Sequence, residues 1–156
     1  MKKVLIPLDY DPTAQKIAEA GFALAQSLNA EVILLHVIAD PLYYSSTAYS
    51  PILGFTGYTD AGTLQQDPAE SLENASRLFL DEFKKQLGDE KTSTLVANGD
   101  LAESILTTAK ETNADIIVMG SHSRRWLEAT LMGSVTEKVL HHTTIPLFII
   151  PTKQKT

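Results

Sequence analysis

Two stretches of this sequence place acidic, hydroxyl and glycine residues where they suit the binding of a phosphorylated ligand. Asp9 follows the apolar run from Lys3 to Leu8, and a carboxylate there can bond a ribose hydroxyl, an adenine amino group or a phosphate-bound Mg²⁺. In the second stretch, Gly120 permits a sharp turn and Gly133-Ser134 opens an apolar helical pattern. The amides of Ser134 and Val135, at the start of that helix, can cradle phosphate groups.

The elements that position these residues are apolar strands and amphipathic helices in strict alternation. The patterns predict strands over 3–8, 31–37, 92–98, 114–119 and 146–150. They predict helices over 13–28, 68–87 and 134–142, and a further helix that begins after Asp100. Such alternation predicts one α/β, Rossmann-like, doubly wound domain over residues 1–152, with a five-stranded parallel sheet of order 3-2-1-4-5 and four helices. Residues 153–156 are expected to form a flexible tail.

Capping signals mark the expected helix starts. A side chain at the N-cap accepts a hydrogen bond from an otherwise unpaired amide, and proline suits the first helical position. The signals are Asp11-Pro12, Asp67-Pro68 with Glu70, Asp100 with Glu103, and Ser134 with Glu137. For Ser134, a capping box is therefore an alternative to a role in phosphate binding.

The segment from Asp40 to Gln66 has a different composition, with tyrosines and Phe55 among glycine, proline, serine and threonine. It shows no sustained periodicity and predicts a long loop. Loops of this length inside compact domains are uncommon, and they often carry function. Two interpretations stay open: a mobile or packed surface loop, and a lid or partner-binding segment.

Composition limits the functions that this chain can have. It has 156 residues, 44% of them hydrophobic, which suits one globular domain, and no apolar run is long enough to span a membrane. The net charge of −6 disfavours broad binding to nucleic acid or anionic membranes, and Arg124-Arg125 is the one basic spot. There is no cysteine and the N-terminus does not resemble a signal peptide, so we expect a cytoplasmic protein.

The expected topology brings the candidate residues together. In an open parallel sheet, ligands bind beyond the carboxyl ends of the strands, at the point where the strand order reverses. For the order 3-2-1-4-5 this point lies between the first and fourth strands. Pro7, Asp9 and Gly120 are the residues that end those strands.

Motifs for phosphoryl transfer and hydrolysis are absent. The sequence has no GxxxxGK[ST] P-loop, no GxGxxG fingerprint, no GxSxG nucleophile elbow and no HExxH metal motif. Only Asp9 and Arg124-Arg125 are candidates for such chemistry, so we expect binding without turnover, or at most weak hydrolysis of a nucleotide. No catalytic residue is assigned, and His36, inside a strand, is expected to be packed.

At these residues the chain resembles the universal stress protein family. Its ATP-binding members carry glycine, two residues, glycine, nine residues, glycine, then serine or threonine. Here the pattern reads Gly120, Ser121-His122, Ser123, residues 124–132 and Gly133-Ser134, so that Ser123 replaces one glycine. The opening VLIPLDY and the segment LLHVI also resemble this family.

The resemblance implies that Val37 offers its backbone to adenine, that Asp9 meets adenine or ribose, and that residues 120–135 hold ribose and phosphates. The implied ligand is ATP, with AMP or ADP as alternatives, and Mg²⁺ could reach Asp9 with the nucleotide. The site residues are Pro7, Leu8, Asp9, Val37, Met119, Gly120, Ser121, His122, Ser123, Arg124, Gly133, Ser134 and Val135.

The resemblance also implies a homodimer through the apolar strand 145–150, whose edge would otherwise be unpaired. The function that it implies is an ATP-dependent regulatory or stress-response module that acts on a protein partner. Two alternatives stay open: a slow ATPase, and an interaction module that has lost nucleotide binding, as Ser123 would suggest.

Overall fold

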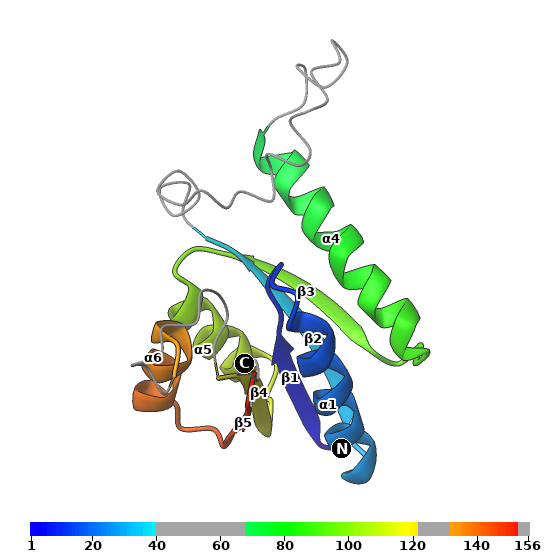
Figure 1. The fold of residues 1–156 in the computed structure, drawn as a ribbon, viewed down its shortest axis with the longest axis vertical. Coiled ribbons are helices and arrows are strands. Elements are labelled where there is room, and N and C mark those ends of the chain that lie inside the picture. The colour runs from blue at the N-terminus through cyan, green and yellow to red at the C-terminus, as the bar shows by residue number, and fades with distance from the viewer. Residues whose placement is uncertain (40–67, 122–131, 153–156) are drawn as a thin grey trace, which may run out of the picture.

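The computed structural model describes residues 1–39, 68–121 and 132–152 and shows a parallel sheet between two layers of helices (Figure 1). Five strands lie in the order β3-β2-β1-β4-β5, which confirms the predicted topology. The predicted loop 40–66 and the predicted tail 153–156 lie outside the described residues. The elements are β1 (Lys3–Pro7), α1 (Ala14–Ser27), β2 (Glu31–Ile38), α4 (Pro68–Leu87), β3 (Ser93–Asn98), α5 (Leu101–Glu111), β4 (Ile116–Gly120), α6 (Ser134–His142) and β5 (Leu147–Ile150).

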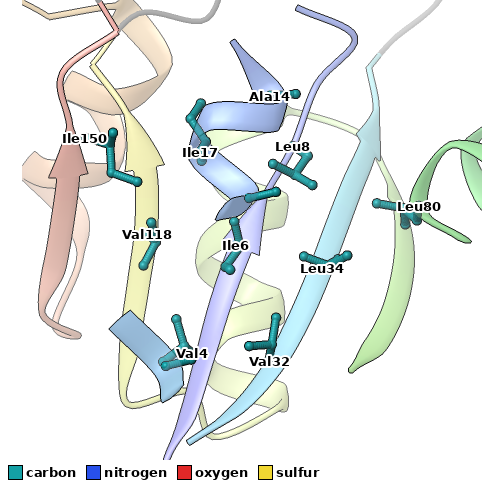
Figure 2. Packing of buried hydrophobic residues seen from close by; sticks show 12 residues of the cluster. Val4, Ile6, Leu8, Ala14, Ile17, Val32, Leu34, Leu80, Val118 and Ile150 are labelled. Atoms are coloured by element: carbon teal, nitrogen blue, oxygen red, sulfur yellow. The ribbon is translucent and has the colours of Figure 1, made fainter. Parts of the chain in front are cut away.

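The central strands are buried on both faces of the sheet, which explains their nearly continuous apolar sequences. Successive side chains of a strand point to opposite faces. In β1, Val4 and Ile6 therefore pack in the core under α1 and α4, whereas Leu5 packs in the core under α5 and α6. Figure 2 shows the first of these cores, in which Ile17 of α1 and Leu80 of α4 contribute alongside the strands.

Helix α4 covers β2 and β3 through an apolar face. Leu80 and Ser76 are fully buried, and Phe79 and Phe83 are partly buried beside them. The helix ends where the sequence predicted, at Gly88. This glycine has a φ of +69°, a backbone conformation that residues other than glycine adopt only with strain.

The structure confirms one predicted helix N-cap and contradicts another. At α5, Asp100 accepts a hydrogen bond of 3.0 Å from the Glu103 amide, as predicted for an N-cap. The N-cap predicted at Asp11 is wrong, because Thr13 is the N-cap residue and the helix begins at Ala14. Asp11 instead holds the turn before the helix, since its Oδ1 accepts from the amide and the hydroxyl of Thr13 at 2.9 and 2.8 Å.

Candidate functional site

A partly open cavity of about 70 Å³ lies at the carboxyl ends of β1, β2 and β4. Its inner wall is apolar, and helices α1, α5 and α6 close it from the sides. This is the position where ligands bind in open α/β sheets. The lining residues are Pro7, Leu8, Asp9, Ile17, Val37, Leu101, Ile105, Met119, Gly120, Val135 and Thr136.

The cavity forms because β1 and β4 separate before they end. Their pairing comprises Val4 with Ile116 and Leu5 with Ile117. In contrast, β1 stays paired with β2 as far as Pro7, which lies opposite Leu35. The space between the diverging ends of β1 and β4 is therefore not closed by backbone pairing.

Asp9 lies at the mouth of this cavity, directly after β1. Its Oδ1 accepts a hydrogen bond of 3.0 Å from the Asp11 amide, which stabilises the turn toward α1. Asp9 also lines the cavity. The turn thus presents an acceptor at the end of the strand, as required of a group that binds a ribose hydroxyl or an adenine amino group.

Gly120 ends β4 and brings α1 close to the cavity, but the reason for its glycine differs from the prediction. Its φ is not positive, so a sharp left-handed turn is not what requires it. Instead, a Cβ at this position would lie 2.5 Å from Ile17 Cδ1 and 3.0 Å from Thr152 Cγ2. Close packing against α1 and the segment after β5 is what excludes a side chain.

The first turn of α6 is joined to the end of β4 by short hydrogen bonds. Thr136 Oγ1 donates to the Gly120 carbonyl at 2.8 Å, and the Gly133 amide donates to the Ser121 carbonyl at 2.6 Å. Ser121 is also buried against Thr152, with 3.2 Å between the two hydroxyl oxygens. The helix start is consequently held beside the cavity.

The predicted capping box at the start of α6 is wrong. Gly133, with a φ of −66° and a ψ of 155°, is the N-cap, and Ser134 is the first helical residue. The Glu137 amide donates to the Gly133 carbonyl at 2.9 Å rather than to a serine side chain. Within the described segments, the Ser134 hydroxyl makes no hydrogen bond, so capping does not explain this serine.

The start of α6 has the features of an anion-binding helix end. Among the described residues, the amides of Ser134, Val135 and Thr136 donate to no main-chain acceptor. Such amides carry the positive end of the helix dipole. Val135 and Thr136 also line the cavity, which places this end of the helix at its rim.

The structure brings together many of the predicted site residues. Ser121, Gly133 and Ser134 lie next to the cavity walls without lining them, and His122, Ser123 and Arg124 lie outside the described residues. The predicted residues that line the cavity are Pro7, Leu8, Asp9, Val37, Met119, Gly120 and Val135.

Sequence reasoning missed Ile17, Leu101, Ile105 and Thr136 as cavity residues. A signal for two of them was present. A helix that follows a parallel strand begins at the carboxyl edge of the sheet, so apolar residues of its first turns, such as Leu101 and Ile105, overhang a site at that edge.

Across 1–39, 68–121 and 132–152, no group of three histidine, aspartate or glutamate side chains is arranged to hold a metal ion. In the same ranges, no helix is both long and apolar enough to cross a bilayer.

Comparison with known proteins places this architecture in a family. The model of the universal stress protein family matches residues 1–151. The chain belongs to the universal stress protein family. The expectation from the glycine and serine spacing is thereby confirmed at the level of the family.

Several universal stress proteins are similar to the chain over nearly its whole length. Universal stress protein MJ0577 of Methanocaldococcus jannaschii is 32% identical over 156 residues, which cover 97% of this chain and 96% of that protein. Universal stress protein YxiE of Bacillus subtilis is 29% identical over 150 residues, which cover 95% and 97% of the two chains. The solved structure of MJ0577 matches with a TM-score of 0.74 and 29% identity over 99% of this chain and 98% of that one.

Proposed function

We propose that this universal stress protein binds an adenine nucleotide, ATP in the first place, in the cavity between the ends of β1 and β4. The observation that carries the proposal is that the apolar cavity, the Asp9 carboxylate and the start of α6 meet at one point. Each suits a different part of a nucleotide. The cavity suits the base, Asp9 suits the ribose or an adenine amino group, and the helix start suits phosphate.

The size of the cavity determines how a nucleotide would fit. Its volume of about 70 Å³ is far below the roughly 300–1,000 Å³ of pockets that enclose a whole ligand. We therefore assign to it the flat base and part of the ribose, with the Val37 backbone beside adenine. The phosphates would lie outside, along residues 120–135 and over the amides of Ser134 and Val135.

A protein of the same fold provides a precedent for the class of ligand. A universal stress protein has been solved in complex with cAMP, and it matches this chain with a TM-score of 0.64 and 16% identity. At this identity the likeness extends to the fold alone. The likeness does not decide the number of phosphates, so AMP and ADP remain alternatives to ATP. Mg²⁺ would reach Asp9 only as part of the nucleotide complex.

We infer a regulatory role rather than turnover, in a cytoplasmic homodimer formed through residues 145–150. The sequence carries none of the P-loop or nucleophile-elbow motifs that support phosphoryl transfer or hydrolysis. At the sheet edge, Phe148 of β5 is 45% exposed, and an apolar edge strand of this kind is usually covered by a partner.

The binding proposal is tested by denaturing the purified protein and identifying any released nucleotide by chromatography and mass spectrometry. Gly133→Val is the test variant, with Gly133→Ala as its control. Because Gly133 has a φ of −66°, neither side chain strains the backbone, and only the larger one should obstruct phosphate. Nucleotide that is released from the wild type and strongly depleted in Gly133→Val supports the proposal. A wild type that carries no nucleotide and takes up no added ATP refutes it.

Turnover is tested separately by following phosphate release from ATP in the presence of Mg²⁺. We expect no release above the background that Asp9→Ala also shows. Release by the wild type that Asp9→Ala abolishes would favour the slow ATPase instead.

A further inference from the structure

His36 of β2 does not line the cavity, yet it is bonded to the cavity wall. The residue is only 3% exposed, and its Nδ1 lies 2.8 Å from the Leu8 carbonyl oxygen. A carbonyl oxygen only accepts hydrogen bonds, so Nδ1 carries the proton. Nε2 is then an acceptor, and it is buried without a hydrogen-bond partner in the described structure.

This bond replaces the next rung of the β1–β2 ladder. The last backbone bond between these strands runs from the Leu8 amide to the Leu35 carbonyl, at 2.7 Å. No main-chain amide of the described residues donates to the Leu8 carbonyl. The imidazole of His36 therefore takes the place of a backbone donor, just where β1 leaves β2 and turns toward Asp9.

The peptide group that His36 holds belongs to the cavity wall. Leu8 and Asp9 both line the cavity, and the Leu8 carbonyl is part of the peptide bond that joins them. We propose that His36 is a positioning residue for the nucleotide site, because its Nδ1–H holds the Leu8–Asp9 peptide in the orientation that presents Asp9 to the ligand. This inference rests on the nucleotide binding proposed above.

An aromatic cluster keeps the imidazole in place. The ring of Tyr10 lies 4.7 Å from that of His36 and the ring of Phe79 lies 5.4 Å from it, both centre to centre. The ring of Tyr10 also packs against Phe79 of α4, 4.7 Å away centre to centre, so the segment after Asp9 is attached to that helix. The residues around His36 leave its ring little freedom to turn, and the bond to Leu8 is thereby pre-organised.

The protonation state of His36 agrees with this role. Burial lowers the pKa of His36, and the bond to the Leu8 carbonyl opposes that effect only in part. Among the described residues, Tyr10 is the titratable side chain whose ring contacts the imidazole, and burial raises the pKa of Tyr10, which keeps it neutral. The neutral imidazole with its proton on Nδ1 is thus the form that holds the Leu8–Asp9 peptide in place.

The test compares His36→Asn with His36→Leu. Both replacements branch at Cγ and have the same number of side-chain heavy atoms, but only asparagine carries an N–H donor at the position of Nδ1. ATP affinity is measured by calorimetry at pH 7.5, and folding stability by urea unfolding. We expect His36→Leu to bind ATP about three- to tenfold more weakly, the range for a lost neutral hydrogen bond, and His36→Asn to bind within about twofold of the wild type.

Equal affinities in all three proteins would overturn the inference, whereas a wild type that does not bind ATP would refute the proposed function itself. If His36→Leu fails to fold, affinity is compared between the wild type and His36→Asn from pH 7.5 to 5.5. Protonation of Nε2, which has no acceptor in the described structure, should release the ring and weaken binding by the wild type alone. Parallel pH profiles would then contradict the role of His36.

Discussion

Thr136 Oγ1 donates a 2.8 Å hydrogen bond to the Gly120 carbonyl, and this bond ties the first turn of α6 to the carboxyl end of β4. Thr136 is almost completely buried, and both residues line the cavity. The start of α6 is therefore held in place by a side chain of the site itself. A helix end held in this way can present its amides without rearrangement when a ligand binds.

Replacing Thr136 with valine should loosen this connection. Valine has the same shape but leaves the Gly120 carbonyl without this donor, which costs about 1–3 kcal/mol in the free energy of unfolding. ATP affinity should fall as well, because the helix start is no longer held at the rim. Urea unfolding and calorimetry measure the two effects. Thr136→Ser keeps the hydroxyl and serves as the control, so an equal loss in the serine variant would contradict this account.

Gly120→Ala should destabilise the protein through its contact with α1. The new Cβ would lie 2.5 Å from Ile17 Cδ1, and such overpacking costs about 1–3 kcal/mol. Ile17→Val removes Cδ1, so the double variant should be more stable than the sum of the two single changes predicts. A double-mutant cycle of unfolding free energies measures this coupling. Strict additivity would show that the packing of Ile17 is not what requires glycine here.

Mild acid should destabilise the folded protein through His36. Its pKa is lowered in the folded state, so at pH values below about 6.5 the unfolded chain binds a proton that the folded chain does not. The stability that neutral His36 contributes is fully present above that pH and is lost as the pH falls toward the folded-state pKa. The free energy of unfolding changes over this range by at most about 1.4 kcal/mol per pH unit.

Urea unfolding of the wild type and His36→Asn at pH 7.5, 6.5 and 5.5 checks this expectation. The difference in unfolding free energy between the two proteins should shift in favour of His36→Asn as the pH falls. A difference that stays constant would show that His36 has the same pKa in both states.

Phe148→Lys should prevent the proposed dimer. A lysine on β5 would place two charges close together across a two-fold edge contact, which disfavours pairing. Leu78→Lys on α4 is the control, because Leu78 is an exposed apolar residue on a different element, at 68% exposure. Light scattering at micromolar concentration should give a dimer for the wild type and the control, and a monomer for Phe148→Lys. A monomeric wild type would refute the dimer proposal.

Local patterns predicted the strands and helices to within one or two residues, but they predicted helix starts less well. Asp100 caps α5 as predicted, because Asp100 has the extended backbone that an N-cap requires. Ser134 does not cap α6, because Gly133 takes that extended conformation and moves the serine into the helix. The residue that becomes the cap depends on the direction in which the preceding chain arrives, and the sequence pattern does not contain that direction.

The sequence by itself determined the order of the elements, the parallel sheet, and the edge at which Asp9 and Gly120 meet. These follow from local periodicity and from the rule that parallel strands all end at the same edge. Only the tertiary structure decided that Ile17, Leu101 and Ile105 close the cavity, and that packing against Ile17 requires glycine at position 120. It also placed the His36 imidazole on the Leu8 carbonyl. These contacts join residues distant along the chain, and they depend on how closely whole elements approach one another, which local patterns do not encode.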